Sequence, residues 1–152
     1  MEKLWKEKEL YLAKFVDEVE LEKFAKEDFT WLQLKEIRLG LKERLDVSVY
    51  AKEEFDAFQM HEIRVGLSKK LDVLIYAKPE FASYEMREIR YGLSLGLDVS
   101  IYSDKRFKVA QMREIRLGLI HKVDVSEYAK PELSYKQMEE IRLKLMKKST
   151  LS

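Results

Sequence analysis

Apolar residues recur along this chain at the spacing of one helix face. Met60, Ile63, Leu67 and Leu71 are separated by three, four and four positions. This spacing predicts an amphipathic helix of about four turns with a single apolar stripe. Equivalent stripes are formed by Leu34, Ile37, Leu41 and Leu45, and by Met112, Ile115, Leu119 and Val123.

The stripe belongs to a unit of 26 residues that recurs along the chain. Such a unit cannot bury its apolar stripe alone, so a fixed period predicts stacked repeats. We therefore predict an all-α fold, a short α-solenoid of long-helix and short-helix repeats, in one repeat domain over residues 1–152. Its parts are a degenerate capping repeat (1–32), four full repeats (33–58, 59–84, 85–110 and 111–136) and a terminal half-repeat (137–152).

The first 32 residues match the repeat only weakly. The segment AKEDFTWLQ (25–33) aligns with AKEEFDAFQ (51–59), and Leu21 and Phe24 align with positions of the short helix. Terminal repeats need a polar outer surface to keep a stack soluble. We expect this role for the charges Glu2, Lys3, Lys6, Glu7, Lys8 and Glu9.

Polar residues mark where each long helix begins. Thr30, Asp56 and Ser134 are each followed three residues later by Gln, which is the capping-box pattern. Ala82 and Lys108 occupy the same position in the two other copies. We expect those two helices to be less well capped.

The second half of each repeat is shorter. An Asp precedes the segments VSVYA, VLIYA, VSIYS and VSEYA, whose β-branched residues are also compatible with strands. We favour a short helix of one to two turns, because Asp is a good N-cap and because Pro79 and Pro131 prevent continuation in two copies. An apolar anchor then ends each turn, at Phe55, Phe81, Phe107 and Leu133.

A glycine lies inside four of the long helices, where it costs about 1 kcal/mol relative to Ala. The terminal half-repeat has Lys144 instead and also lacks the short helix. We therefore interpret the glycine as space for the short helix or its tyrosine. A backbone that contacts a ligand is the alternative, but the turn context of phosphate-binding loops is missing. The glycines are Gly40, Gly66, Gly92 and Gly118, and the tyrosines are Tyr50, Tyr76, Tyr102 and Tyr128.

Glu-Ile-Arg is the dominant polar motif. Residues two apart on a helix point in nearly opposite directions, so Glu and Arg of one copy cannot pair with each other. In a parallel stack they can instead form a ladder of ion pairs between neighbouring helices. The alternative is an exposed arginine column that binds the phosphates of nucleic acid. That column consists of Arg38, Arg64, Arg90, Arg116 and Arg142.

Residues that differ between copies are the better candidates for contacts with a specific partner. Tyr91, Leu95 and Ile101 predict an apolar patch, which is a partner site if exposed and ordinary core if buried. Arg87 and Arg113 occupy another variable position, early in the long helix. These five residues are the candidate partner-binding site.

Composition narrows the classes of function. The 29 Lys and Arg balance 28 Asp and Glu, so the whole chain has no field that would hold a polyanion. There is no cysteine, and His61 and His121 occupy different repeat positions. No metal spacing, nucleophile motif or cofactor fingerprint occurs. We expect no cofactor, no metal and no catalytic activity.

The chain carries no long apolar segment. No run approaches the ~20 apolar residues that span a bilayer, and the N-terminus MEKLWKEKELYLAKF lacks the apolar core of a signal peptide. A cytoplasmic protein without a membrane partner is expected.

The pattern Q-M-x-E-I-R-x-G-L-x-x-x-L-D-V-S-x-Y-A-x-P-x-F, as in Gln59 to Phe81, resembles a tandem repeat in uncharacterised proteins of gut anaerobic bacteria, their phages and conjugative elements. The resemblance spans Phe24 to Leu145. The first repeat departs from it, with Leu10 and Leu12 at the Glu and Arg positions. The resemblance implies a mobile-element setting, in which small repeat proteins bind host or defence proteins, and it brings no functional residues with it.

The expected function is non-catalytic protein binding, with inhibition of a host defence factor as its narrower form. The alternative is nucleic-acid binding through the arginine column. Self-association is a third alternative, because the ends and flat faces of solenoids can stack.

Overall fold

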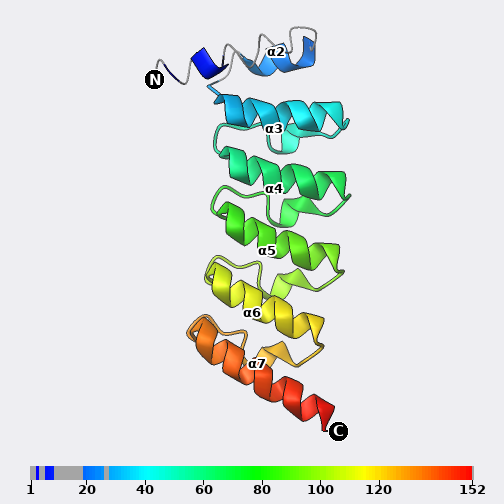
Figure 1. The fold of residues 1–152 in the computed structure, drawn as a ribbon, viewed down its shortest axis with the longest axis vertical. Coiled ribbons are helices and arrows are strands. Elements are labelled where there is room, and N and C mark those ends of the chain that lie inside the picture. Colours follow the sequence, from blue (N-terminus) through cyan, green and yellow to red (C-terminus); the bar gives the residue numbers. More distant parts are fainter. Residues whose placement is uncertain (1–2, 4–5, 9–18, 26–27, 152) are drawn as a thin grey trace. The chain divides into compact units, whose positions relative to one another are not determined.

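The computed structural model describes residues 3, 6–8, 19–25 and 28–151, and these residues form helices but no strand (Figure 1). The predicted all-α solenoid fold is confirmed, because consecutive long helices pack against each other from α2 to α4 and from α5 to α7. The α-helices are α2 (Val19–Ala25), α3 (Trp31–Lys42), α4 (Ala57–Ser68), α5 (Ser83–Ser94), α6 (Val109–Ile120) and α7 (Tyr135–Thr150). The 3-10 helices are η1 (Val47–Val49), η2 (Val73–Ile75), η3 (Val99–Ile101) and η4 (Val125–Glu127).

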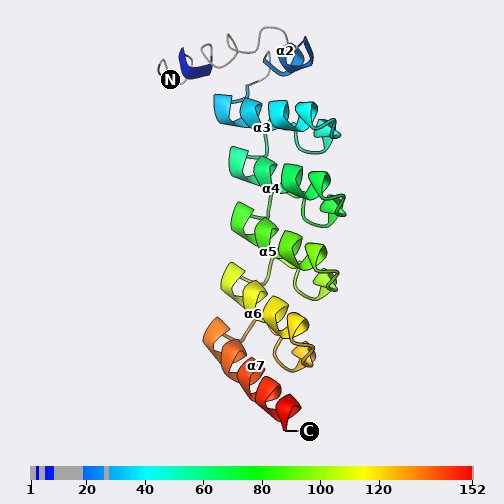
Figure 2. The ribbon, with the colours of Figure 1, turned by 45° about the vertical axis from the view of Figure 1, so that its right-hand side comes forward.

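The chain divides into two compact units, Met1–Lys70 and Leu71–Ser152. In the first, α2 packs on α3 and α3 on α4; in the second, α5 packs on α6 and α6 on α7. Three of the 3-10 helices, η1, η3 and η4, lie beside the long helix that precedes them, as η3 does beside α5 (Figure 2). A single domain over residues 1–152 stays a prediction.

The long helices begin as the capping pattern predicts. Thr30, Asp56 and Ser134 each accept a hydrogen bond from the backbone N–H of the Gln three residues later, and the Gln side chain accepts from the cap N–H. Ala82 and Lys108 offer no side-chain cap. Half of the box nevertheless persists there, because Glu85 and Gln111 accept from the N–H of Ala82 and Lys108 at 2.9 and 2.7 Å. The expected weaker capping is therefore only partial.

The long helices α3 to α6 are each followed by a residue in the left-handed conformation, which turns the chain toward the short helix. In α3 the N–H of Leu45 donates to the Gly40 carbonyl and that of Arg44 to the Leu41 carbonyl, which is the Schellman arrangement. The left-handed residue is Gly96 after α5, with φ 70°, but Arg44 has φ 59°. Non-glycine residues adopt this conformation at a cost, because Cβ approaches the following carbonyl oxygen. The same geometry recurs at Lys70 and Lys122.

The short helices are single 3-10 turns of three residues, at the lower end of the predicted length. Asp46, Asp98 and Asp124 cap them by accepting from the backbone N–H of the Ser two residues later. Asp72 makes no side-chain cap among the described residues. There Leu74 replaces the serine whose hydroxyl otherwise holds the aspartate.

The helical glycines make room for the tyrosines, as predicted. The fully buried Tyr102 donates its hydroxyl to the Glu88 carbonyl at 2.7 Å. A Cβ on Gly92 would overlap that hydroxyl and lie 2.6 Å from Val99 Cγ1. Burial raises the pKa of this phenol, so it stays protonated and can donate. Tyr50 over Gly40 and Tyr128 over Gly118 repeat the arrangement.

The two ends of the chain depart from the repeat. At the first short-helix position the chain forms the α-helix α2 instead of a 3-10 turn, because Leu21, Glu22 and Lys23 are stronger helix formers than Val-Ser-Val. At the other end α7 continues through Lys144 to Thr150, with no short helix.

The expected polar end is only partly as predicted. Lys3 and Lys6 are exposed, whereas Lys8 is buried and Glu7 accepts a hydrogen bond from the Trp31 indole at 2.9 Å. The positions of Glu2, Glu9, Leu10 and Leu12 lie outside the described residues.

The first two residues of each predicted stripe lie in the core, together with the phenylalanine anchors, whereas the last two residues of each stripe and the anchor Leu133 are half-buried. Ile37, Met60, Ile89 and Ile115 have no exposed surface, and Phe107 is 3% exposed. The residues that vary between copies can therefore differ only on the remaining helix surface.

Candidate functional site

The Glu and Arg columns form the predicted ladder. In three places an Arg Nε donates to a Glu Oε2 of the preceding long helix at 2.7 Å. The pairs are Glu36–Arg64, Glu88–Arg116 and Glu114–Arg142. Their arginine side chains are only 12, 14 and 11% exposed. Most of each guanidinium is therefore used within the stack.

The other two members of the arginine column are also withdrawn from the surface. Arg90 is buried and Arg38 is half-buried. A column that binds phosphates requires accessible guanidinium groups. The structure thus offers no open row of arginines in the described chain, and nucleic-acid binding by this column stays a prediction without structural support.

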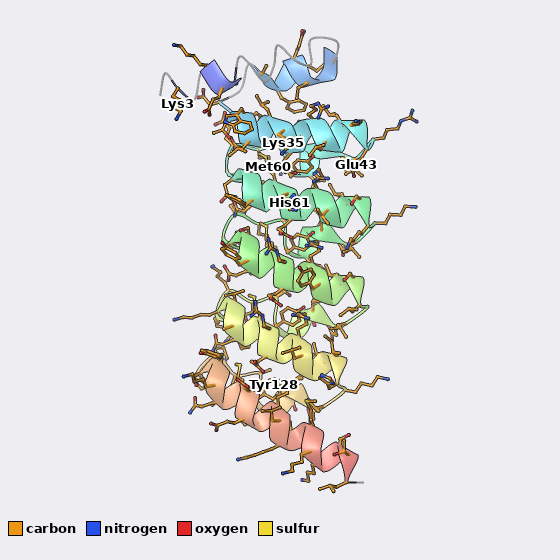
Figure 3. All side chains as sticks on the ribbon, in the orientation of Figure 1. Lys3, Lys35, Glu43, Met60, His61 and Tyr128 are labelled. Atoms are coloured by element: carbon orange, nitrogen blue, oxygen red, sulfur yellow. The ribbon has the colours of Figure 1, made fainter. Side chains whose placement is uncertain are left out.

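Polar groups surround the ladder in the first unit. Arg64 Nη1 donates to Glu43 Oε1 at 2.8 Å, so this guanidinium contacts two carboxylates. His61 Nδ1 lies 3.4 Å from Glu36 Oε1. Figure 3 shows Glu43 at the C-terminal end of α3 and His61 on α4. The Glu36–Arg64 ion pair therefore has charged and polar neighbours, Glu43 and His61.

The equivalent pair in the second unit has aromatic surroundings. The Tyr91 ring lies between two guanidinium groups, with Arg90 Cζ 4.9 Å and Arg116 Cζ 5.5 Å from its centroid. Arg113 Nε is 3.3 Å from Glu88 Oε1. These contacts hold the Tyr91 ring and Arg116 in place, since cation–π and ion-pair interactions act on the same guanidinium.

One side of α5 and α6 presents large side chains to solvent. On α5, Tyr84, Tyr91 and Leu95 are 64, 39 and 57% exposed. Arg87 lies between them in the helical sequence and stacks on Tyr84, with Cζ 5.8 Å from the ring centroid. On α6, Arg113 is exposed at the position that corresponds to Arg87, and Ile120 is exposed at the position that corresponds to Ser94. We call the six residues Tyr84, Arg87, Tyr91, Leu95, Arg113 and Ile120 the tyrosine face.

The tyrosine face unites four of the five predicted partner-binding residues. Ile101 is the exception: it lies half-buried on η3, whose Val99 packs against Gly92 on the buried side of α5. Ile101 is therefore not counted in the tyrosine face, and its contact with a partner stays a prediction. Tyr84 and Ile120 were not among the predicted site residues. Both lie at helical spacing from predicted ones, since Tyr84 precedes Arg87 by three residues and Ile120 follows Arg113 by seven.

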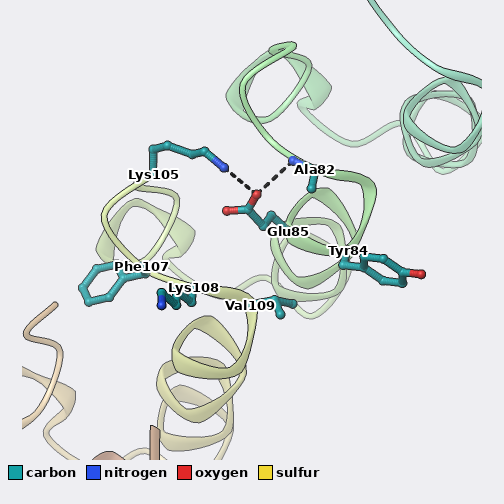
Figure 4. A pocket seen from close by; sticks show the side chains of 7 residues that line it. All are labelled: Ala82, Tyr84, Glu85, Lys105, Phe107, Lys108 and Val109. Carbon is teal, nitrogen blue, oxygen red and sulfur yellow. Dashed lines mark hydrogen bonds and ion pairs between the residues drawn. The ribbon is translucent and has the colours of Figure 1, made fainter. Parts of the chain in front are cut away.

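A hollow of about 280 Å³ adjoins Tyr84. It is lined by Ala82, Tyr84, Glu85, Lys105, Phe107, Lys108 and Val109. The Glu85 carboxylate accepts from Lys105 Nζ at 2.7 Å and from the Ala82 N–H at 2.9 Å, and Tyr84 lies on the side of Glu85 away from Lys105 (Figure 4).

One lining residue of the hollow, Glu85, differs from the Gln at the equivalent position of the other copies. In other copies a Gln side chain binds the following turn: Gln33 Nε2 donates to the Phe55 carbonyl at 2.7 Å and Gln111 Nε2 to the Leu133 carbonyl at 2.6 Å. Glu85 cannot donate as an ionised carboxylate. Lys105 supplies the cation instead. Glu85 among four glutamines was the sequence signal that could have identified this site.

The described residues contain no cluster of three or more His, Cys, Asp or Glu side chains that could hold a metal ion. His61 contacts Glu36, whereas His121 is exposed at the C-terminal end of α6. Among the helices in the described part of the chain, none has the length and apolar character needed to cross a membrane.

Comparison with known proteins finds no matching family model, no matching curated protein and no matching solved structure. The surface chemistry of the molecule is therefore the basis for a functional assignment.

Proposed function

We propose that this chain is a non-catalytic protein-binding module that contacts its partner through the tyrosine face. The observation that carries the proposal is the exposure of Tyr84, Tyr91 and Leu95 on one side of α5. An exposed apolar patch with polar residues around it is typical of an interaction site.

The residue types of the face support this function. Tyr and Arg are enriched where protein interfaces are most strongly stabilised, and Tyr contributes a large contact area with few rotatable bonds. Tyr91 is also held between Arg90 and Arg116 before any partner binds. A side chain that is already ordered loses less entropy on binding.

The narrower prediction, inhibition of a host defence factor, depends only on the resemblance to repeat proteins of mobile elements. It stays a prediction. Nucleic-acid binding is the competing function, and the same experiment tests it.

The test is capture from bacterial lysate with the tagged full chain, with and without nuclease treatment. We expect one stoichiometric protein that survives nuclease treatment and is lost from the Tyr84→Ser/Tyr91→Ser variant. Phe58→Ser is the matched control, because Phe58 is 71% exposed at the position in α4 that corresponds to Tyr84.

Two outcomes would contradict the proposal. A partner retained equally by the double tyrosine variant would place binding elsewhere. Retention that disappears with nuclease treatment would assign the molecule to nucleic-acid binding.

A further inference from the structure

We infer that the segment bound by the tyrosine face is an acidic peptide segment of a protein, with one apolar side chain that enters the hollow beside Tyr84. This inference rests on the proposed function and specifies the chemistry of its partner.

The outward surface of α5 and α6 has a positive charge that the whole chain lacks. The chain has a formal net charge of +1, but the outward positions of these two fully described helices include Arg87 and Arg113 and no carboxylate. These positions are Tyr84, Arg87, Tyr91, Ser94, Leu95, Ala110, Arg113, Leu117, Ile120 and His121.

The carboxylates on α5 and α6 themselves are buried. Glu85, Glu88 and Glu114 are 7, 3 and 7% exposed. Glu85 pairs with Lys105 and Glu114 with Arg142, whereas Glu88 pairs with both Arg116 and Arg113. The negative charges are thus neutralised inside the stack, while Arg113 keeps 59% of its side chain exposed. Complementary charge favours carboxylates in the partner.

The hollow supplies a place for an apolar anchor. Ala82, Phe107 and Val109 contribute apolar surface to it, and the exposed Lys108 borders it. Tyr84 belongs to both the hollow and the tyrosine face. A single segment can therefore place an apolar side chain in the hollow and carboxylates near Lys108, Arg87 and Arg113.

The pattern of the face favours a protein over nucleic acid. Its two arginines lie early in α5 and α6, and the exposed groups that follow them along these helices, Tyr91, Leu95 and Ile120, are apolar. Phosphate recognition instead uses several cations along a continuous path. The ladder arginines that could extend such a path, such as Arg116 and Arg142, are bound to glutamates.

The probe is a displayed library of random peptides of about 16 residues, long enough for four helical turns. It is selected on the immobilised full chain, and enriched peptides are then labelled and titrated. We expect them to carry net negative charge and at least one Leu, Phe, Tyr or Trp. The variants Arg87→Gln/Arg113→Gln and, separately, Tyr84→Ser should each weaken their binding about tenfold or more.

The control is Lys35→Gln/Lys42→Gln, which removes the same charge from the exposed surface of α3. It should leave peptide affinity unchanged. Thermal melts of every variant establish that each remains folded, and the separate tyrosine variant tests the face without changing its charge.

The inference is overturned if no peptide is enriched, if enriched peptides are neutral or basic, or if the arginine variant binds them normally. Two rival partners would also overturn it. Nucleic acid is the partner if a labelled single-stranded oligodeoxynucleotide binds the wild-type chain and loses affinity in the arginine variant. A second copy of the chain is the partner if the selected peptides match exposed segments of this chain and the chain dimerises. If a protein captured from lysate still depended on Tyr84 and Tyr91, protein binding through the tyrosine face would be retained and only the acidic character of the partner would be rejected.

Discussion

The contact between α3 and α4 and the contact between α5 and α6 contain the same ion pair in different surroundings. Glu36–Arg64 and Glu88–Arg116 both have an Nε to Oε2 distance of 2.7 Å. In the first contact Glu43 provides a second carboxylate for the arginine. In the second, the corresponding residue is Leu95, and Tyr91 stacks on the arginine instead.

This comparison distinguishes the residues that stabilise the stacking of the repeats from the residues that give each exposed surface its chemistry. The ladder, the glycine and the tyrosine beneath it are the same in both contacts, so they serve the stacking of repeats. Leu39 and Tyr91, Glu43 and Leu95 occupy equivalent positions but present different chemistry. A repeat protein can thus acquire a binding surface in one place without altering the contacts that stabilise it.

The largest expected effect concerns the shared scaffold. Gly40→Ala and Gly92→Ala should each lower the free energy of unfolding by about 2–4 kcal/mol, because a Cβ overpacks the site and displaces the tyrosine hydroxyl. Chemical denaturation of both variants measures this.

The matched control is the double variant Gly92→Ala/Tyr102→Phe, which removes the hydroxyl that the new Cβ meets. Its destabilisation should be smaller than the sum of the two single effects. Additive effects would show that the glycine does not act through this tyrosine.

The second largest expected effect is the loss of a ladder glutamate, and it should differ between the α3–α4 contact and the α5–α6 contact. Glu88→Gln should destabilise the protein by about 2–3 kcal/mol and Glu36→Gln by about 1 kcal/mol, because Arg64 retains Glu43 whereas Arg116 keeps no carboxylate among its recorded partners. Adding Leu95→Glu to Glu88→Gln should recover part of the loss by supplying the missing carboxylate. Equal losses for the two single variants, or no recovery, would contradict this account.

A smaller effect is expected for the aromatic group. Tyr91→Leu should lower the free energy of unfolding by about 1 kcal/mol, since it removes two cation–π contacts but leaves Glu88–Arg116 intact. A double-mutant cycle with Arg116→Gln measures the coupling. An interaction energy of zero would mean that the stacking contributes nothing.

The smallest effect concerns the helix ends. Arg44→Gly should stabilise the protein by about 0.5–1 kcal/mol, whereas Gly96→Lys should destabilise it by a similar amount, because both residues have positive φ. Thermal unfolding of the two variants should show shifts of opposite sign. Shifts of the same sign would contradict the conformational explanation.

Much of the scaffold could be predicted from the residues alone. The capping boxes at Thr30 and Asp56 follow from hydrogen-bonding rules that act over three residues. The role of Gly92 and the pairing of Glu88 with Arg116 also followed, because a 26-residue period repeats the same geometry at every contact. Of the five predicted partner-binding residues, Tyr91, Leu95, Arg87 and Arg113 lie on the tyrosine face, whereas Ile101 lies half-buried on η3.

Local sequence by itself determined the period, the helix starts and the residues that must face the next repeat, because these depend on chemistry close in the chain and on repetition. Only the tertiary structure decided which apolar side chains remain exposed. Tyr84 and Ile101 are both large and variable, yet one is exposed and the other half-buried. Exposure depends on what packs against a residue from elsewhere in the chain, and no local pattern carries that information.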